Sequence, residues 1–160
     1  MKMTSLFFIA VLLCNAASAQ LKTTVKCPEI DVNLLKGIVN GTILPNSDPA
    51  LIRHDLPCVT ASEANKCGVT VAYKTKDIYF YTDRDYVEIG PAFKGKLSLP
   101  IMGASRGSLF KYLAAPQIKE SNWEAYETAY GILIVYFNKQ NRVNKIQFST
   151  RSSKNIQLCE

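Results

Sequence analysis

Residues 131–150, GILIVYFNKQNRVNKIQFST, constrain the fold more than any other part of the chain. Two apolar runs flank the polar tetrad 138–141, which is the layout of a β-hairpin. The first run is apolar throughout, as is typical of a central strand covered on both faces. In the second run Val143 and Ile146 are three residues apart, which interrupts strict alternation and indicates a β-bulge. Neither run places a nucleophile beside a base, so we expect this hairpin to build the core.

The first nineteen residues are typical of a secretory signal peptide. Lys2 supplies a positive charge, residues 6–14 form an unbroken apolar run, and Ala17-Ser18-Ala19 offers small side chains to a signal peptidase. The apolar run is about half as long as a bilayer-spanning helix. We therefore predict a signal peptide over 1–19, cleavage near Ala19 and no stable membrane span.

Lipid attachment at Cys14 is the competing interpretation of this leader, although Leu13 stands where a small residue is expected. Residues 20–160 are long enough for one domain with a real core. Of 19 Lys and Arg residues, 18 remain once Lys2 is removed, against 13 Asp and Glu residues, which leaves a net charge of +5. These charges are scattered, as on a solvated surface, although an affinity for acidic surfaces also fits.

Four cysteines remain in the mature chain: Cys27, Cys58, Cys67 and Cys159. An even number in an exported chain predicts disulfides, which places the protein in the periplasm or outside the cell. We favour Cys58 with Cys67, which closes a short polar loop, and Cys27 with Cys159, which ties the two ends together. The wide spacings and a single histidine argue against structural zinc, and no other metal or cofactor is predicted.

Helices are predicted over residues 31–39, where Asp31 is a capping residue, and over 105–116, where Pro116 ends the apolar pattern. A further helical turn fits residues 48–56. From residue 68 the pattern becomes extended, with strands over 68–73 and 78–89 and a turn at 82–85.

The stretches 78–89 and 133–146 share a layout of an aromatic-rich strand, a polar turn and a strand with valine and isoleucine. Each follows a predicted helix and a proline-containing loop. The two stretches are either a duplication or simply two similar hairpins. In both cases we predict an α+β fold, an antiparallel sheet with helices packed on one face, and duplication would make it two helix–loop–β-hairpin repeats.

The segment from LAAP through Trp123 to YGILIVYFNKQNRVNKI resembles the repeating unit of the β-lactamase-inhibitor-like fold, which also occurs in small lipoproteins of outer-membrane assembly. In those groups a helix ends in a Gly-x-Pro-like corner, and a strand finishing in Tyr-Phe precedes a polar turn. The resemblance covers residues 103–149 well and 31–90 poorly, and Ala114-Ala115-Pro116 stands where a glycine is typical. It implies a helix–hairpin fold that binds proteins, and it implies no catalytic residue.

The candidate catalytic residues match no known constellation, so we predict none. His54 beside Asp55 suggests a general base, but no serine lies in a Gly-x-Ser-x-Gly elbow. Glu120, Glu124 and Glu127 could supply paired carboxylates for glycoside hydrolysis. A small secreted hydrolase acting on cell-wall polymer through His54 or these carboxylates is the alternative function.

Three further carboxylates, Asp83, Asp85 and Glu88, crowd one predicted turn. Alternating carboxylates can bind calcium, but Arg84 in their midst and the missing glycine oppose it. We therefore predict a solvated hairpin turn here and no metal site.

Aromatic residues interleaved with lysines suggest a binding surface. Its predicted members are Tyr73, Tyr79, Tyr81, Tyr86 and Trp123. Tyrosine gives a large contact area at low entropy cost, although core packing would also explain these residues. We predict an exported, non-enzymatic protein-binding domain of the bacterial periplasm or envelope, of an inhibitor, immunity or scaffold type. Its partner is another protein and not nucleic acid, and a purely structural envelope protein also fits.

Overall fold

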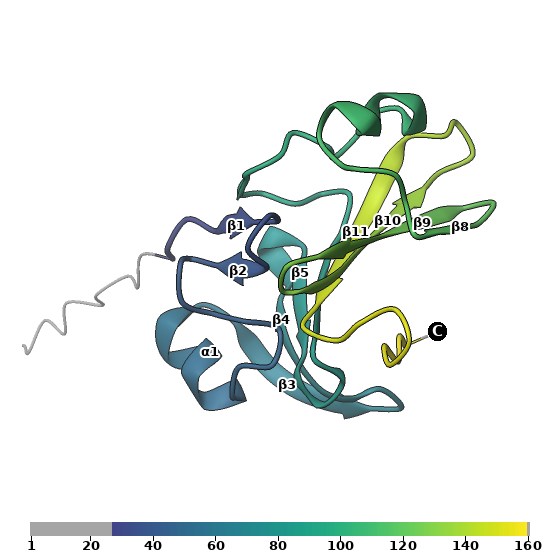
Figure 1. The fold of residues 1–160 in the computed structure, drawn as a ribbon. Coiled ribbons are helices and arrows are strands. Elements are labelled where there is room, and N and C mark those ends of the chain that lie inside the picture. The colour runs from purple at the N-terminus through teal and green to yellow at the C-terminus, as the bar shows by residue number, and fades with distance from the viewer. Residues whose placement is uncertain (1–26, 160) are drawn as a thin grey trace, which may run out of the picture.

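The computed structural model describes residues 27–159, apart from the side chains of residues 61–65 (Figure 1). The predicted signal peptide lies outside the described residues. Strands alternate with tight turns along most of this part of the chain. In chain order the elements are β1 (Asp31–Asn33), β2 (Ile38–Val39), α1 (Pro49–Asp55), β3 (Thr60–Asn65), β4 (Gly68–Tyr73), η1 (Lys74–Lys76), β5 (Ile78–Tyr81), η2 (Thr82–Arg84), β6 (Tyr86–Ile89), β7 (Lys96–Leu97), η3 (Arg106–Lys111), β8 (Ile118–Lys119), β9 (Trp123–Thr128), β10 (Gly131–Phe137) and β11 (Val143–Ser149).

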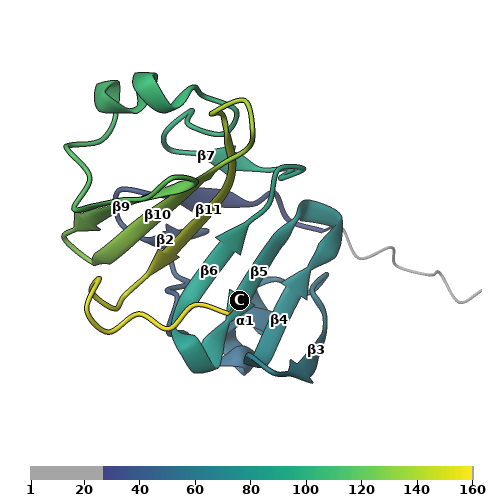
Figure 2. The same cartoon turned by 90° about the vertical axis from the view of Figure 1, so that its right-hand side faces the viewer.

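An eight-stranded antiparallel sheet dominates the structure, in the order β3-β4-β5-β6-β11-β10-β9-β8. It consists of two four-stranded meanders, β3 to β6 and β8 to β11. The meanders meet where their last strands, β6 and β11, pair from Ile89 opposite Ile146 to Tyr86 opposite Ser149 (Figure 2). The antiparallel sheet is therefore confirmed, and the two similar hairpins lie side by side within it. Their duplication stays a prediction.

Asx residues in the left-handed region make the tight connections possible. Asp77 follows η1 with φ 56°, Asp85 follows η2 with φ 55°, and Asn141 in the β10–β11 turn has φ 54°. Aspartate and asparagine reach this region more readily than other residues with a Cβ. The predicted turn at 82–85 is thus confirmed. The predicted bulge is confirmed as well, because Tyr136 pairs with Lys145 but Phe137 pairs with Val143.

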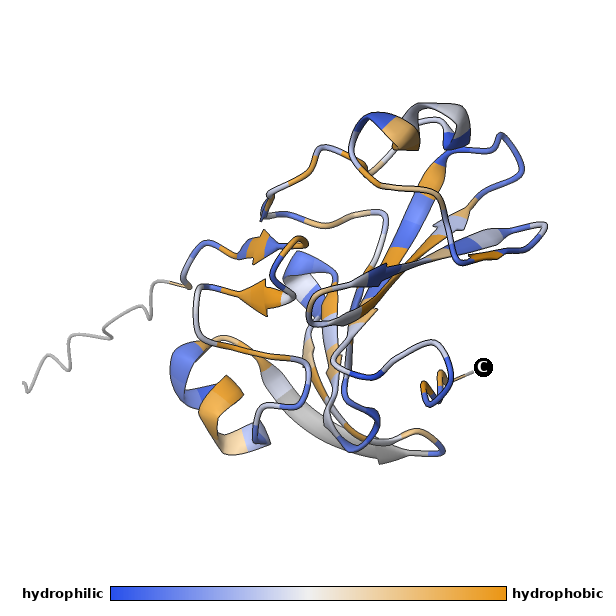
Figure 3. Cartoon of the chain, in the orientation of Figure 1, coloured by the Kyte–Doolittle hydropathy of each residue, from blue (hydrophilic) through white to orange (hydrophobic). Residues whose placement is uncertain are grey.

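The core lies between one face of the large sheet and the long connections that cover it. The covering elements are α1, η3 and a small sheet in the order β2-β1-β7. The middle residue of β1 and both residues of β2 are apolar (Figure 3). Buried residues from the connections, such as Val32, Ile52 and Leu109, belong to the same cluster as Phe80 and Phe148 of the sheet.

The predicted α+β class is wrong, because strands account for 37% of the structure and helical residues for 15%. The predicted helical turn near Pro49 is confirmed as α1, whose Asp48 cap accepts a hydrogen bond from the Ala50 amide at 2.7 Å. Within residues 27–159 α1 is the one α-helix.

The two other predicted helices fail for local reasons. At 31–39 the Asn33 side chain accepts hydrogen bonds from the amides of Leu35 and Lys36, which turns the chain back into a β-ribbon. Gly37 completes this turn with φ 64°. In the segment 105–116 only a 3₁₀ helix, η3, forms, and it contains a glycine, which is a poor helix former.

All four cysteines form disulfides, as predicted, but the predicted pairing is wrong. Cys27 bonds Cys58 and Cys67 bonds Cys159, with Cα–Cα distances of 5.5 Å in both. The residues between Cys58 and Cys67 form strand β3 rather than a loop, and six extended residues span about 20 Å, too far for a disulfide. In the chain-entropy model the closed loops of 31 and 92 residues contribute about 3.7 and about 4.6 kcal/mol.

The two disulfides are consistent with a protein that matures outside the cytoplasm. Over residues 27–159 no helix has the length and apolar character needed to cross a bilayer.

Disulfide mapping tests the pairing directly, because trypsin cleaves after Lys66 and separates Cys58 from Cys67. A non-reducing digest should contain fragment 27–36 linked to 54–66, and 67–74 linked to 155–160. Mass spectrometry before and after reduction identifies both species. A link between 54–66 and 67–74 would contradict the structure.

Gly131 is required where β9 turns into β10. Its φ is 148°, and a Cβ there would overlap the carbonyl oxygen of Ser149 on β11. We expect Gly131→Ala to lower the free energy of unfolding in urea by more than about 2 kcal/mol. Gly107→Ala is the control, since its Cβ would meet no atom within 4 Å, and its effect should stay within about 0.5 kcal/mol. Equal stability of the two variants would refute this assignment.

Candidate functional site: the outer face of the large sheet

Alternation along the strands sends every second side chain away from the core. In β5, Ile78 and Phe80 are buried while Tyr79 and Tyr81 point to the other side. We call this other side the outer face. One row of paired positions crosses it and shows its character: Ala72, Tyr79, Glu88, Gln147, Ile134 and Ala125.

The structure places four of the five predicted aromatic residues on the outer face. Tyr79, Tyr81 and Trp123 are partly exposed there. Tyr86 is on the same face but is fully buried, and its ring stacks on Tyr81 with centroids 4.4 Å apart. Tyr73 is directed into the core and is 1% exposed, so it offers no surface to a partner. In the sequence, Tyr73 falls on the same alternating face of β4 as the valines, and this pattern distinguishes it from the other four predicted aromatic residues.

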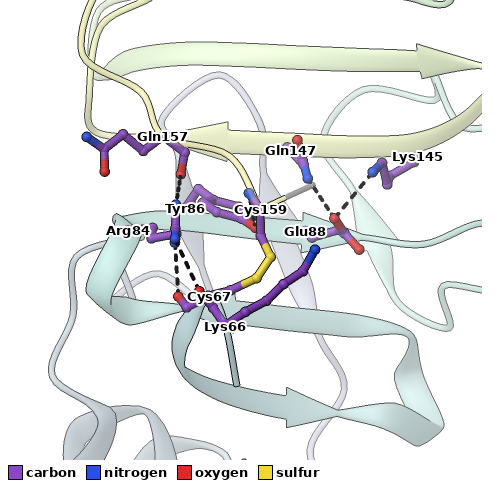
Figure 4. Close-up of a disulfide and its surroundings, with 9 residues drawn as sticks. All are labelled: Lys66, Cys67, Arg84, Tyr86, Glu88, Lys145, Gln147, Gln157 and Cys159. Atoms are coloured by element: carbon purple, nitrogen blue, oxygen red, sulfur yellow. Dashed lines mark hydrogen bonds and ion pairs between the residues drawn. A yellow bond between two sulfur atoms is a disulfide. The ribbon is translucent and has the colours of Figure 1, made fainter. Parts of the chain in front are cut away.

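A polar network lies in the middle of the outer face (Figure 4). The buried Gln147 side chain donates to Glu88 at 2.6 Å and accepts from the Tyr136 hydroxyl at 2.8 Å. The Lys145 ammonium lies 3.5 Å from the same Glu88 carboxylate and 4.1 Å from the centre of the Tyr136 ring. The network therefore holds one anion and one cation side by side on a partly desolvated sheet. Sequence reasoning missed Tyr136, Lys145 and Gln147.

Aromatic rings flank this network on both sides. Tyr79 and Tyr81 come from β5, whereas Trp123 and Tyr136 come from β9 and β10 with ring centroids 6.5 Å apart. Burial raises the pKa of Tyr81, and the nearby Glu88 carboxylate adds to the rise. Burial also raises the pKa of Tyr79, with Asp77 acting in the same direction. The phenols are thus neutral at pH 7 and can donate hydrogen bonds.

The C-terminal segment 150–159, which we call the strap, crosses the outer face after β11 (Figure 2). Its Ile156 and Leu158 pack on a strip formed by Ala125, Ile132 and Ile134. The strip residues are each at most 1% exposed. The strap thus covers the apolar part of the outer face.

Polar contacts and a disulfide fix the strap (Figure 4). Ser153 donates through its hydroxyl to Glu127 at 2.6 Å, which is the main cause of the lowered pKa of that carboxyl. The Arg84 guanidinium donates to the Gln157 carbonyl at 3.5 Å, and the Cys159 amide donates to the Tyr86 hydroxyl at 3.3 Å. Cys159 then bonds Cys67, which directly precedes β4.

The residues of the predicted hydrolase do not come together. His54 lies on α1 with its side chain 85% exposed and contacts Asp55 at 2.9 Å, a contact that lowers the pKa of Asp55. Glu124 and Glu127 are three residues apart on β9 and therefore lie on opposite faces of the sheet. Glu120 is exposed in the loop before β9.

The buried Glu124 carboxylate is held by two hydrogen bonds. It accepts from Arg106 at 2.9 Å and from the Tyr126 hydroxyl at 2.6 Å. Arg106 also donates to the carbonyl oxygens of Glu120 and Ser121, which ties the η3 segment to the loop before β9. Both carboxylate oxygens are thus engaged, so this group anchors a loop.

The carboxylates of the 82–88 turn also separate. Asp83 accepts from the Val69 amide at 2.9 Å, and Asp85 pairs with Arg151 at 2.7 Å. Glu88 belongs to the outer-face network. Among residues 27–159 no three His, Cys, Asp or Glu side chains are arranged to hold a metal ion.

Comparisons of the chain with protein-family models, with curated proteins and with solved structures find no match. The resemblance to the β-lactamase-inhibitor-like fold therefore stays a prediction.

The buried phenol of Tyr86 makes stability depend on alkaline pH. Burial raises its pKa well above the ordinary value of about 10, so the folded state keeps a proton that the unfolded state releases. The stabilisation is complete below pH 10 and declines as pH rises above it. Urea unfolding at pH 8 to 11 should show a shallower decline for Tyr86→Phe than for the wild type. Identical slopes would contradict the assignment, whatever the difference between the two proteins at pH 8.

Proposed function

We propose that this chain is an exported, non-enzymatic protein-binding domain that contacts its partner through the outer face. The observation that carries the proposal is a set of four partly exposed aromatic residues that flank one partly desolvated charge network. The aromatic residues are Tyr79, Tyr81, Trp123 and Tyr136. Tyrosine and tryptophan are enriched among residues that dominate binding energy, and they contribute most where surrounding contacts exclude water.

The charge network adds specificity to this apolar surface. Glu88 and Lys145 have side-chain exposures of 20% and 34%, so a docked partner would remove most of their remaining water. A buried pair is favourable only if the partner's groups complete its hydrogen bonds. The partner is therefore a protein whose contact surface carries apolar side chains around a polar centre.

The scaffold is suited to binding because little of it has to be ordered on contact. The aromatic residues stand on paired strands, and two disulfides attach Cys27 and the end of the strap to the segments on either side of the edge strand β3. A surface that is rigid before contact loses less entropy on association. An inhibitor, an immunity protein or a scaffold protein uses such a surface, and the proposal covers these three types.

A competing surface surrounds the η3 segment, where Leu35, Phe110 and Tyr112 are exposed by 58%, 76% and 38%. Two hollows of about 250 and 420 Å³ flank this segment. The polar groups in the larger hollow, Arg106, Glu124 and Tyr126, are already bonded to one another and anchor the loop before β9, so the outer face is the stronger candidate. The exposed side chains of this competing surface provide matched control variants.

Affinity capture from periplasmic extract or culture supernatant of the source cells tests the proposal. The wild type should retain a stoichiometric protein partner, and Tyr81→Ser or Trp123→Ser should weaken binding of the purified partner at least tenfold by calorimetry. Phe110→Ser and Tyr112→Ser should leave its affinity within about twofold. The reverse pattern would move the interface to the η3 segment. Retention of no protein by the wild type would count against a binding function.

A further inference from the structure

We propose that the strip beneath the strap is a docking groove for an extended aliphatic segment of a partner protein. In this structure the strap fills the groove in cis, and reduction of the Cys67–Cys159 disulfide opens it. The biological role of the groove rests on the proposed function, whereas the groove itself is argued from the strap contacts alone.

The strip is an apolar interruption of a surface that should be polar. An antiparallel sheet with one face on the core normally turns polar side chains outward. On β10, however, Ile132 and Ile134 point outward, and with Ala125 of β9 they form a cluster separate from the main core. Ile118, Trp123 and Tyr136 border it. Such a strip needs a cover, and in this chain the strap is that cover.

The strap itself shows which chemistry fits the strip. Ile156 and Leu158 pack on the cluster while Gln157 between them is exposed, which is the alternation of an extended segment. A partner segment with two aliphatic side chains two residues apart would reproduce these contacts. Each such side chain removes apolar surface from water at both sides of the contact.

Noncovalent attachment of the strap is sparse beyond Arg151. It has no strand pairing, and the amides of Asn155 and Ile156 bond back to Ser152 within the strap. Arg151 at its start pairs with Asp85, and beyond Arg151 the polar contacts of the strap to the sheet come from Ser153, Gln157 and Cys159. Segments held in this way open at lower free energy than core strands. The disulfide is therefore the bond that keeps the strip covered.

Opening requires a dithiol reductant, such as a thiol–disulfide oxidoreductase of the extracytoplasmic space. One reductant thiolate attacks the sulfur of Cys159, which is less buried than Cys67, and Cys67 leaves as a thiolate. The second reductant thiol then releases Cys159. Two electrons and two protons pass to the protein, which gains two thiols, and the reductant becomes a disulfide. The released strap exposes the strip beside Trp123 and Tyr136, so the two binding areas become continuous.

Hydrogen exchange of the full chain tests the gate. On addition of dithiothreitol, amides of residues 152–159 should exchange at least tenfold faster while those of β5, β6, β10 and β11 stay protected. Cys67→Ser with Cys159→Ser should show the same pattern without reductant. The matched control, Cys27→Ser with Cys58→Ser, should keep the strap protected, because that disulfide fixes the opposite end of the chain. Unchanged strap exchange, or loss of protection throughout the sheet, would overturn the gate.

A synthetic peptide of residues 150–158, TRSSKNIQL, tests the groove. The receptor is the full chain carrying Cys67→Ser, Cys159→Ser, Ile156→Ser and Leu158→Ser, so that its own strap cannot compete. Fluorescence anisotropy should show the labelled peptide binding at least tenfold more tightly than a version with serine at Ile156 and Leu158. The oxidised wild type should bind neither peptide.

Equal binding of the two peptides by a receptor whose sheet amides stay protected would overturn the groove. If the receptor does not fold, the two peptides are titrated instead into the wild type in dithiothreitol. Equal binding of the two peptides there would likewise refute the proposal. Neither assay depends on Tyr79 or Tyr81. Failure of either assay is therefore distinct from failure of the proposed function.

Discussion

The pairing of β6 with β11 is the interaction on which the rest of the structure depends. It joins two meanders that are each local in sequence, and it aligns Ile89 with Ile146 and Val87 with Phe148 on the core face. On the other face it brings Glu88 beside Gln147. These residues are about sixty positions apart, so the chain must order a long connection before this contact forms. Both the core and the outer-face network therefore depend on one long-range register.

Local features of the fold could be predicted from the sequence, because their causes are local. The hairpin at 131–150, its bulge, the turn at 82–85 and the Asp48 cap each follow from side chains within a few positions. Helical periodicity at 31–39 was misleading, because the Asn33 side chain offers the backbone a competing set of hydrogen bonds. The disulfide pairing was out of reach for a different reason. It depends on β3 being extended and on the path that the strap takes.

The candidate site was predicted only in part, because some of its contacts are local in sequence and others are not. Alternation within β5 identifies Tyr79 and Tyr81 as neighbours on one face, and alternation with the valines of β4 assigns Tyr73 to the core side. The contact of Gln147 with Glu88 requires the β6–β11 register, which no local pattern encodes. The buried Tyr86 hydroxyl accepts from the Cys159 amide of the strap, whose path over the sheet depends on two aliphatic side chains and a cysteine in an otherwise polar segment.

The two disulfides also determine how the molecule responds to mechanical tension. A force applied across Cys27 and Cys159 passes through the first disulfide to Cys58 and through the second from Cys67. Only the residues between Cys58 and Cys67, most of them in β3, carry the load through the backbone. Fully stretched, this stretch reaches about 30 Å. The Cys67–Cys159 disulfide carries the force past the remaining seven strands of the large sheet. A molecule pulled from its two ends would therefore lose the pairing of one edge strand, β3, and then stop lengthening.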